Sequence, residues 1–387
     1  MKAIINGKVI LPNAQGNFFI QENYTILFDE VIQKIIPENE IVAEEIVDVG
    51  GRYISPGFIN IHIHGCGGKD TMDEEDDALK IMCKILVEHG VTSFLPTTMT
   101  YDIPKIHRAF ERVRKFMNNP AEGAKILGCH MEGPFISAKY KGAQAEKNIC
   151  KADYKFVEGF EDVIKIITFA PEEISDWSFV EKCQAAGIIL SIGHTAANYE
   201  QAMDAVENHK IKHFTHLFNA MTNFHHRKPG VVGAALDTDS ICELITDNIH
   251  VSPAAQRIAY HAKQGKNIIL ITDSMRACGI GDGISELGGQ KVFVKGALAT
   301  LEDGTLVGSV IEMNRAVKNF WQNTKISLPE VVELVTKNPA QELNLYRKIG
   351  SIEIGKQADF AIFDNELNIF ASVVSGKIFP QIDNQKC

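Results

Sequence analysis

Two histidines, one residue apart, close an apolar run early in the sequence. His62 and His64 end the run 57–64, and side chains two positions apart project from the same face of a strand. Imidazole nitrogens are ligands of zinc, iron, manganese and cobalt ions, and such ions lower the pKa of a bound water enough to supply hydroxide near neutral pH. Two interpretations are open at this point: a metal site, or two polar residues that share a strand.

The same kind of side chain recurs where other apolar runs end. Six of eight such runs finish on a histidine or a carboxylate, and the residues beyond the first pair are Glu132, His194, His216, His250 and Asp273. A single histidine at a strand end is more often a hydrogen-bonded structural residue than a ligand. The repetition favours a shared metal site, in which a carboxylate can bridge two ions.

Asp273 lies near the end of the run 267–274, directly after the residues 268–272, and has two interpretations of its own. Aspartate is a preferred N-cap residue, so Asp273 could begin a helix at Ser274. At the end of a strand, its carboxylate could instead take a proton from a metal-bound water and return it to a leaving group. We favour the proton shuttle.

The runs alternate with helix-length amphipathic segments, such as 76–89, 104–117 and 252–264. Eight strands alternating with helices predict a (β/α)8 barrel, whose chemistry comes from the C-terminal ends of several strands at once. The expected barrel strands are 57–64, 93–98, 126–133, 164–171, 188–195, 213–220, 241–250 and 267–274.

Both ends of the chain have a different texture, with short strands separated by turns. The expected strands are 2–10, 17–20, 25–29, 31–36 and 369–375. We therefore predict an α/β protein with a TIM-type barrel domain over 55–349. Residues 1–54 together with 350–387 are expected to form a small β-sandwich domain.

The composition excludes several classes of partner. The 387 residues are 45% hydrophobic and 23% charged, as in ordinary globular proteins, and the net charge of -10 disfavours nucleic acid or an anionic membrane as the main partner. No signal core is visible, and no run reaches the ~20 apolar residues that a membrane span needs, so we expect a cytoplasmic protein. The eight scattered cysteines predict reduced, packed thiols.

Three further positions have open interpretations. His130 shares a strand face with Glu132 and either supports a ligand or fills the barrel. His213 begins its run, so packing is the better interpretation. The segment 219–230 is either an ordinary exposed loop or a substrate-holding loop in which Arg227 binds a phosphate or carboxylate.

With these residues in view, the chain resembles the N-acetylglucosamine-6-phosphate deacetylase family, a branch of the amidohydrolase superfamily. The resemblance covers nearly the whole length of the chain. The occurrence of "EGPF", "THLFNAM" and "HHRKPG" in this order is specific to the family. The motifs are "PGFINIHIHGCGG", "HMEGPFISAKYKGAQ", "SIGHTAA", "THLFNAM", "HHRKPG", "ELITDNIHV", "ILITDSM", "DGTLVGS", "NPAQELNL" and "GSIEIGKQADF".

The resemblance implies hydrolysis of N-acetyl-D-glucosamine 6-phosphate to D-glucosamine 6-phosphate and acetate, in amino-sugar catabolism and cell-wall sugar recycling. A metal-bound hydroxide is expected to attack the acetamide, with Asp273 acting as base and then as acid. Glu132, His194 and His216 match the metal-binding positions of the family. The positions that match its substrate contacts are Ala143, Gln144, Asn219, Ala220, Arg227, Asp247, Asn248, Ile249, His250, Leu306, Val307 and Gly308. The family also implies a homodimer in which Arg227 reaches the phosphate in the neighbouring active site.

Two positions bear on the details of that site. Members with one metal have lost the His-x-His pair, whereas this chain keeps His62 and His64. We therefore expect one or two divalent ions per subunit, with two favoured, held by His62, His64, Asp273 and the matched ligands, with Glu132 bridging. Gln144 stands where some members carry a histidine that polarises the amide carbonyl. A glutamine carries no charge, which leaves the oxyanion stabiliser open; a second metal could supply that role.

Two alternatives belong to other classes. The chain could be another amidohydrolase acting on a cyclic amide or a nucleobase; many such enzymes bridge two metals with a modified lysine at the end of the fourth strand. Here the only lysine of "IKIITFAP", Lys165, lies at the start of the run, and Glu132 is available instead. A catalytically dead barrel kept as a scaffold is disfavoured because the strand ends keep their ligands.

Overall fold

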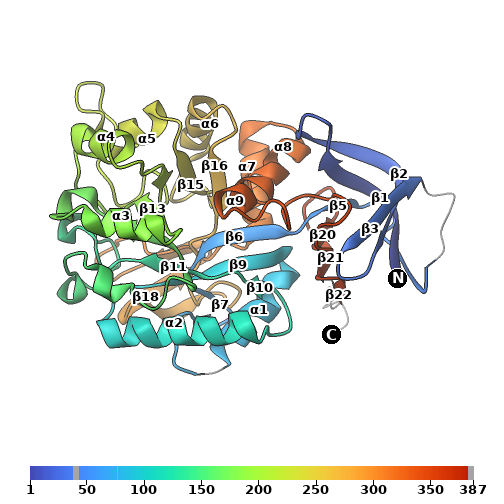
Figure 1. The fold of residues 1–387 in the computed structure, drawn as a ribbon, viewed down its shortest axis with the longest axis horizontal. Coiled ribbons are helices and arrows are strands. Elements are labelled where there is room, and N and C mark those ends of the chain that lie inside the picture. Colours follow the sequence, from blue (N-terminus) through green and yellow to red (C-terminus); the bar gives the residue numbers. More distant parts are fainter. Residues whose placement is uncertain (38–42, 76, 382–387) are drawn as a thin grey trace.

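The computed structural model describes residues 1–37, 43–75 and 77–381, and within them the chain forms a parallel barrel with a small mixed sheet at one side (Figure 1). Each predicted run overlaps one barrel strand, and β9 begins two residues before its run. These strands are β6 (Phe58–Ile63), β9 (Val91–Thr98), β11 (Cys129–Glu132), β12 (Ile164–Phe169), β13 (Ile189–Ile192), β14 (His213–Phe214), β15 (Ile241–Ile245) and β16 (Ile268–Ile271). The strands pair in parallel in chain order, and the short strand β10 (Lys125–Ile126) lies beside β9. The predicted fold class is confirmed.

The first and last barrel strands meet through single hydrogen bonds rather than a continuous ladder. At the mouth, the Asp273 N–H donates to the His62 carbonyl over 3.0 Å, and the His64 N–H donates to the Ser274 carbonyl over 2.9 Å. At the opposite end of the barrel, the backbone carbonyls of residues 334 and 335 lie between the two strands and accept hydrogen bonds from backbone N–H groups of both strands. The barrel is therefore closed most directly at the end that carries the predicted site.

Helices cover the barrel because one face of each is apolar. They are α1 (Ala78–Glu88), α2 (Ile103–Asn118), α3 (Ser178–Ala185), α4 (Tyr199–Glu207), α5 (Gly230–Asp237), α6 (Pro253–Ala262), α7 (Met313–Thr324), α8 (Leu328–Glu333) and α9 (Lys337–Glu342). In α2 the buried residues Ile106, Phe110 and Val113 follow helical spacing, and the side chain of Asp102 caps the helix by accepting from the Lys105 N–H. The predicted segments 104–117 and 252–264 overlap α2 and α6. The predicted segment 76–89 overlaps α1, and Asp76 lies outside the described residues.

Strands from both chain ends form one mixed sheet in the order β22-β21-β20-β5-β1-β2-β3, with β4 beside β1. Their bounds are β1 (Lys2–Pro12), β2 (Phe18–Phe28), β3 (Ile32–Pro37), β4 (Glu45–Asp48), β5 (Tyr53–Pro56), β20 (Phe360–Phe363), β21 (Ile369–Val374) and β22 (Lys377–Pro380). This sheet has a separate hydrophobic core, in which Ile4, Ile54 and Phe360 are fully buried. Strands from both ends of the chain contribute to this sheet, as the predicted small β domain requires. The domain boundaries at 54/55 and 349/350 stay a prediction. Residues 382–387 lie outside the described residues.

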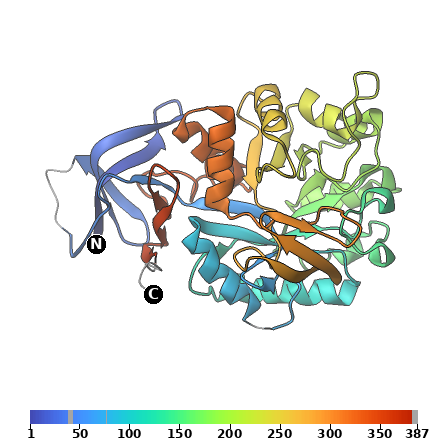
Figure 2. The same ribbon diagram turned by 180° about the vertical axis from the view of Figure 1, so that it is seen from behind.

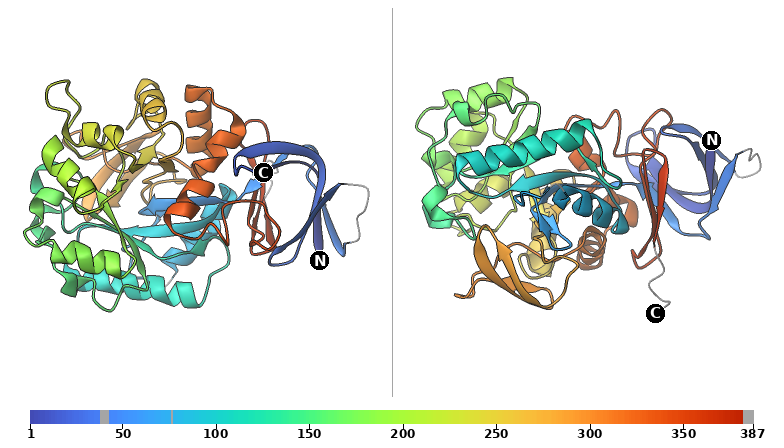
Figure 3. Two further views of the ribbon diagram at one scale, coloured as in Figure 1. Left: turned by 45° about the horizontal axis from the view of Figure 1, so that its top comes forward. Right: turned by 90° about the horizontal axis from the view of Figure 1, so that it is seen from below.

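A three-stranded sheet that the sequence did not suggest is inserted between β16 and α7. Its strands are β17 (Gly283–Leu287), β18 (Gln290–Lys295) and β19 (Leu298–Thr300). Figures 2 and 3 show this sheet alongside the barrel. Two short strands, β7 (Gly65–Cys66) and β8 (Lys69–Asp70), follow β6, and 3-10 turns η1 (Ala138–Tyr140), η2 (Glu146–Asn148), η3 (Tyr154–Phe156) and η4 (Pro171–Glu173) lie after β11 and β12.

Several predicted strands are shorter than expected, and the difference is largest for the runs that contain β14 and β15. The run 213–220 is strand only in β14, and the run 241–250 is strand only in β15. Beyond β14 the backbone turns, with positive φ at His216, Phe218 and Ala220. Leu217 is buried and Phe218 is partly buried in this turn, so the apolar residues continue past the strand and hydrophobicity alone overstated its length.

Two findings bear on the expected location and on the thiols. In the ranges 1–37, 43–75 and 77–381, no helix combines the length and the apolar character needed to cross a bilayer. Seven cysteines are free thiols, all buried except Cys150, and burial raises the pKa of thiols such as Cys83 to about 12. Cys387 lies outside the described residues.

Candidate metal centre and substrate cavity

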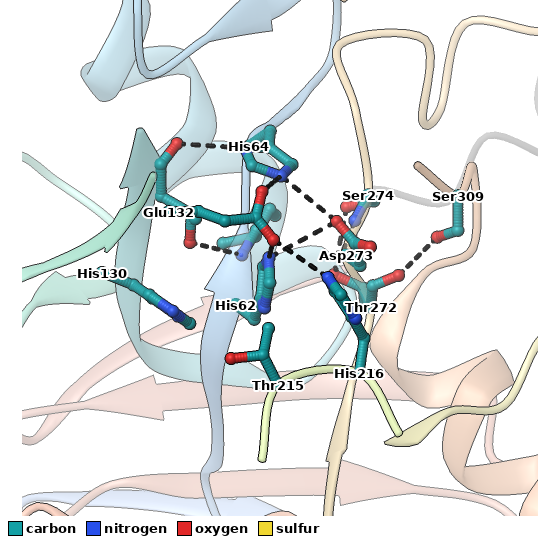
Figure 4. Close-up of polar contacts among 12 residues, drawn as sticks. His62, His64, His130, Glu132, Thr215, His216, Thr272, Asp273, Ser274 and Ser309 are labelled. Atoms are coloured by element: carbon teal, nitrogen blue, oxygen red, sulfur yellow. Dashed lines mark hydrogen bonds and ion pairs between the residues drawn. The ribbon is translucent and has the colours of Figure 1, made fainter. Parts of the chain in front are cut away.

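Glu132, the last residue of β11, lies among four imidazoles at the barrel mouth, and Figure 4 labels three of them, those of His62, His64 and His216. Its Oε1 atom is 3.1 Å from His216 Nε2, 3.2 Å from His194 Nε2 and 3.4 Å from His62 Nε2. Its Oε2 atom is 3.3 Å from His64 Nε2. All five side chains are almost wholly buried, so the structure brings residues from four strand ends into one cluster.

Asp273 completes the cluster on the far side of the His62–His64 pair. Its Oδ1 atom is 3.2 Å from His64 Nε2 and 3.5 Å from His62 Nε2. The residues that follow form a turn rather than a helix in the described range 274–282, so Asp273 is not an N-cap. The N-cap interpretation is therefore wrong, and the carboxylate lies at the mouth as the shuttle interpretation requires.

The donor set fits a divalent cation. The ligand atoms of His62, His64 and Glu132 lie within 4.8 Å of one another, as do those of Glu132, His194 and His216. The buried His62 Nε2 atom faces two carboxylates but has no hydrogen-bond partner among the described residues. Two histidine Nε2 atoms, of His194 and His216, are only 3.1 Å apart. An oxygen and nitrogen set of this kind, with Glu132 common to both groups, suits zinc, iron, manganese or cobalt.

The cluster is strongly coupled electrostatically. Burial alone would lower the pKa of His216, but the bond and charge of Glu132 outweigh it and raise that pKa to about 9. His64 behaves similarly, because its bonds to Asp273 and Glu132 overcome burial and raise its pKa well above the ordinary value. Burial would raise the pKa values of Glu132 and Asp273, yet the neighbouring imidazoles lower both. Both carboxylates are thus anionic near neutral pH, as cation ligands must be.

Three of these residues lie just beyond their strands with positive φ: His194 (47°), His216 (31°) and Asp273 (46°). Left-handed backbone at a residue other than glycine costs of order 1–3 kcal/mol and persists where the surroundings fix it. Asp273 is fixed on both sides, since its N–H donates to His62 and its carbonyl accepts from the Ser309 N–H over 2.7 Å. The turn at each strand end aims the side chain across the mouth instead of along the barrel wall.

Three of the four imidazoles are oriented through their second nitrogen, whereas His216 Nδ1 has no hydrogen-bond partner among the described residues. His194 Nδ1 lies 2.9 Å from the Tyr140 carbonyl, and His64 Nδ1 lies 3.2 Å from the Thr97 carbonyl. Such bonds fix the tautomer and leave Nε2 toward Glu132. His62 has a different partner: its Nδ1 is 2.9 Å from the carboxylate of Glu243 on β15. Glu243 was missed from the sequence, where an acid within the apolar run 241–245 was the available signal.

The two histidines with open interpretations are both buried. His130 Nδ1 lies 3.0 Å from the Ile61 carbonyl and its Nε2 lies 2.7 Å from Thr168 Oγ1, so both nitrogens are engaged within the barrel wall. Burial, then the charge of His62, lowers the pKa of His130 to about 3, so this imidazole is neutral. It fills the barrel. His213 does more than pack, because it contacts the carboxylates of Glu342 and Glu243 over 2.8 and 3.3 Å.

A cavity of about 400 Å³ opens above the cluster. Its floor includes His64, Glu132, His194, His216 and Asp273, while His62 lies fully buried beneath. The predicted substrate positions that line it are Ala143, Gln144, Asn219, Ala220, His250, Leu306, Val307 and Gly308. The lining residues that the sequence did not indicate are Met99, Lys139, Tyr140, Gly142, Leu287 and Thr305. Lys139, Tyr140 and Gly142 lie inside the motif "HMEGPFISAKYKGAQ", and Thr305 lies inside "DGTLVGS", but the resemblance implied no role for them. Met99 follows β9, and Leu287 is the last residue of β17 in the inserted sheet.

Four predicted contacts do not line the cavity of this chain: Arg227, Asp247, Asn248 and Ile249. Asp247 binds His250 Nδ1 over 2.6 Å and accepts from the His250 N–H, so it holds the lining histidine in place. The Asn248 side chain accepts from Gln256 and Asn323 on the outer helices, facing away from the cavity. Arg227 lies in an exposed loop, where its guanidinium contacts His226.

The Gln144 side chain is engaged with the cluster itself. Its Nε2 donates to Glu132 Oε2 over 2.6 Å, and its Oε1 accepts from the Thr100 N–H over 2.7 Å. The backbone donor identifies which end of the amide is the oxygen. Gln144 therefore orients Glu132, and its amide is not directed at a substrate carbonyl.

The lysine that a cyclic-amide hydrolase would use is misplaced. Lys165 lies near the start of β12, and its Nζ donates to the Asp162 carbonyl over 2.7 Å, at the opposite end of the barrel from Glu132. Glu132 takes the shared position between the two histidine groups instead.

A parallel barrel with histidines and carboxylates gathered at its strand ends defines a metal-dependent hydrolase in architecture. The sequence profile of the Amidohydrolase family matches residues 53–382. The chain belongs to the amidohydrolase family.

Its relatives within that family agree with the resemblance seen in the motifs. The chain is 38% identical to an N-acetylglucosamine-6-phosphate deacetylase of Bacillus subtilis (strain 168), with 94% of each chain covered. It is 41% identical to the enzyme of that name from Lysinibacillus sphaericus, covering 86% of this chain and 87% of the other. A crystal structure of N-acetylglucosamine-6-phosphate deacetylase from Pasteurella multocida matches with a TM-score of 0.91 at 30% identity, covering 98% of this chain and 100% of that one.

Proposed function

We propose that this protein hydrolyses the acetamide of N-acetyl-D-glucosamine 6-phosphate, releasing acetate and D-glucosamine 6-phosphate in amino-sugar metabolism of the cytoplasm. The observation that carries the proposal is Glu132 shared by two histidine groups at the floor of a cavity, with Asp273 beside it. The sequence relatives indicate the substrate, because proteins with this enzyme name match the chain over most of its length.

The proposed cofactor is a divalent cation, with two ions per subunit favoured. His62, His64 and Glu132 would hold one, and Glu132, His194 and His216 the other, with Asp273 in reach of the first group. When bound, such ions supply a water of lowered pKa and a Lewis acid for the amide carbonyl. The second contribution matters here, because the Gln144 amide is already committed to Glu132.

Asp273 is the proposed proton shuttle. The imidazoles of His62 and His64 offset burial and lower the pKa of its carboxyl, so it begins the reaction as a base. Its side chain lies on the cavity floor and is 12% exposed, which lets it face both the attacking water and the departing amine. The same group can then return the proton to the sugar nitrogen.

The proposed phosphate site requires a second subunit. Arg227 projects from an exposed loop and does not line its own cavity, and Phe224 in the same loop is 60% exposed. An exposed aromatic side chain beside an arginine is a composition typical of interface cores. These observations support a homodimer in which Arg227 enters the neighbouring active site.

The experiment is acetate release by the metal-loaded protein from the phosphorylated sugar, compared with the unphosphorylated sugar. We expect turnover of the first and at least 100-fold less of the second, because the phosphate contacts are lost. Asp273→Asn should lower kcat by about 10²–10⁴, the contribution of a general acid and base. A metal-loaded wild-type protein that releases no acetate would contradict the proposal.

A further inference from the structure

A buried carboxylate lies beneath the metal centre, outside the cavity. Glu243 comes from the middle of β15 and has no exposed surface. Its Oε2 atom lies 2.9 Å from His62 Nδ1 and accepts from the His216 N–H over 3.3 Å. A charge so deep in a barrel is costly unless every oxygen is paired, and this carboxylate is paired with parts of the site above it.

The two contacts on Oε2 involve different metal groups. His62 belongs to the group with His64, while His216 belongs to the group with His194. Because the His62 Nδ1–H donates to Glu243, the ring must present Nε2 to Glu132 and Asp273. The second contact fixes the backbone of His216 at its left-handed turn (φ 31°). One carboxylate thus holds a candidate ligand of each group.

We propose that Glu243 is a positioning residue for metal binding, holding His62 and His216 so that both ions can be bound at once. This inference rests on the metal site of the proposed function, and its test therefore measures metal content rather than acetate release. Glu243 does not touch the cavity, so no direct contact with substrate is involved.

A metal ion bound by Glu243 itself is disfavoured by geometry. The ligand atoms of His62, His130 and Glu243 lie close enough to hold a cation. However, His130 uses both nitrogens, one beside the Ile61 carbonyl and one beside Thr168 Oγ1, so it offers no lone pair directed at a third ion. Glu243 acts through His62 rather than as a ligand.

The contacts of the other Glu243 oxygen, Oε1, lead to a residue that can serve as a control variant. Oε1 lies 3.3 Å from His213 Nε2, and His213 Nδ1 lies 2.8 Å from Glu342 at the end of α9, toward the opposite end of the barrel. Glu342→Gln therefore perturbs the same buried network without touching His62 or His216. A merely structural network would respond alike at both ends.

The test compares Glu243→Gln, Glu243→Leu and Glu342→Gln in the full chain. Each protein is stripped of metal, titrated with Co²⁺, and analysed for metal content and for the visible absorption of bound Co²⁺. Thermal unfolding of the metal-free proteins reports folding. We expect wild type and Glu342→Gln to bind two equivalents with equal affinity and equal spectra.

Glu243→Gln keeps an acceptor oxygen but no charge, and we expect its weaker Co²⁺ site to lose 10- to 100-fold in affinity, as losses of such outer partners do. Glu243→Leu should bind one equivalent at most. If the wild-type protein binds a single ion, we expect Glu243→Gln to lower the affinity for that ion by the same factor, because Glu243 holds a ligand in either group. Wild-type affinity and spectrum in Glu243→Gln would overturn the proposal, even if Glu243→Leu fails to fold. Failure of the deacetylase proposal would appear separately, as absent acetate release by loaded wild type.

Discussion

At the scale of single residues, Glu132 decides what the site can hold. Its Oε1 atom faces three histidines and its Oε2 atom faces His64, so both groups depend on one carboxylate, which Gln144 keeps in place. The His-x-His pair, Glu132 and Asp273 could be placed together from the sequence, because residue type and strand-end position are visible there. The direction of the Gln144 amide and the bond from His62 to Glu243 could not, since each depends on a partner far away in the chain.

The proposed two-ion site depends on the His62–His64 pair. We expect His62→Asn combined with His64→Asn to remove one metal equivalent, because one of the two groups loses both imidazoles while Glu132, His194 and His216 remain. Metal analysis after dialysis measures this. His261→Asn, an exposed histidine on α6, serves as the control. Unchanged stoichiometry in the double variant would show that this pair holds no ion.

Metal binding should depend on pH. In the metal-free protein the pKa of His216 is raised to about 9, so its imidazole carries a proton at neutral pH that a metal ion must displace. Affinity is therefore expected to rise with pH up to about 9, by roughly tenfold per unit for each proton displaced. Calorimetric titration in buffers of different ionisation enthalpy counts the protons released. An affinity independent of pH between 6.5 and 8.5 would contradict this assignment.

At the scale of elements, strand ends rather than strand interiors carry the site. The alternation of apolar runs and amphipathic helices was sufficient to predict eight strands, because burial on both faces makes parallel strands uniformly apolar. It was insufficient to predict the length of β14, which has only two residues, or the turns at His194, His216 and Asp273. A buried turn and a buried strand have the same hydrophobicity, and they differ only in backbone angles.

The helices stabilise the barrel at a distance from the chemistry, and α2 offers a clean case. Asp102 caps this helix by accepting from the Lys105 N–H over 3.0 Å, so Asp102→Ala should lower the free energy of unfolding by about 1 kcal/mol. Chemical denaturation measures the loss, and the kcat of acetate release should not change. Asp77→Ala is the matched control, because Asp77 precedes α1 without a side-chain cap bond. Equal losses in the two variants would contradict the capping role.

At the scale of the whole molecule, the cavity of one subunit offers few cationic side chains for the phosphate of the proposed substrate. The cavity is lined by one lysine, Lys139, while Arg227 lies outside on an exposed loop. The family resemblance suggested this arrangement from the motif "HHRKPG", and the single chain agrees in placing Arg227 where a neighbour could receive it. The dimer itself stays a prediction.

Mixed dimers can test whether Arg227 acts across subunits. Arg227→Ala alone should raise KM for the phosphorylated sugar at least tenfold, because a bidentate contact to phosphate is lost. When Arg227→Ala and Asp273→Asn subunits are co-refolded, one site of each mixed dimer regains both groups if Arg227 acts in the neighbour. We expect that site to show the wild-type KM. Mixed dimers with the KM of Arg227→Ala would place the arginine in its own site. Lys228→Ala, the adjacent exposed cation, is the control.

The pairing of β5 with β20 has a consequence for how the chain is made. Ser55 lies opposite Ala361 and Pro56 opposite Phe360, so strands from the beginning of the chain are completed only by strands from its end. During synthesis, β1 to β5 emerge first, yet the partner edge of β5 stays open until the entire barrel has been translated. An open, apolar strand edge is an aggregation hazard for that interval. A nascent chain stalled before residue 360 is therefore the species that a chaperone would be expected to bind.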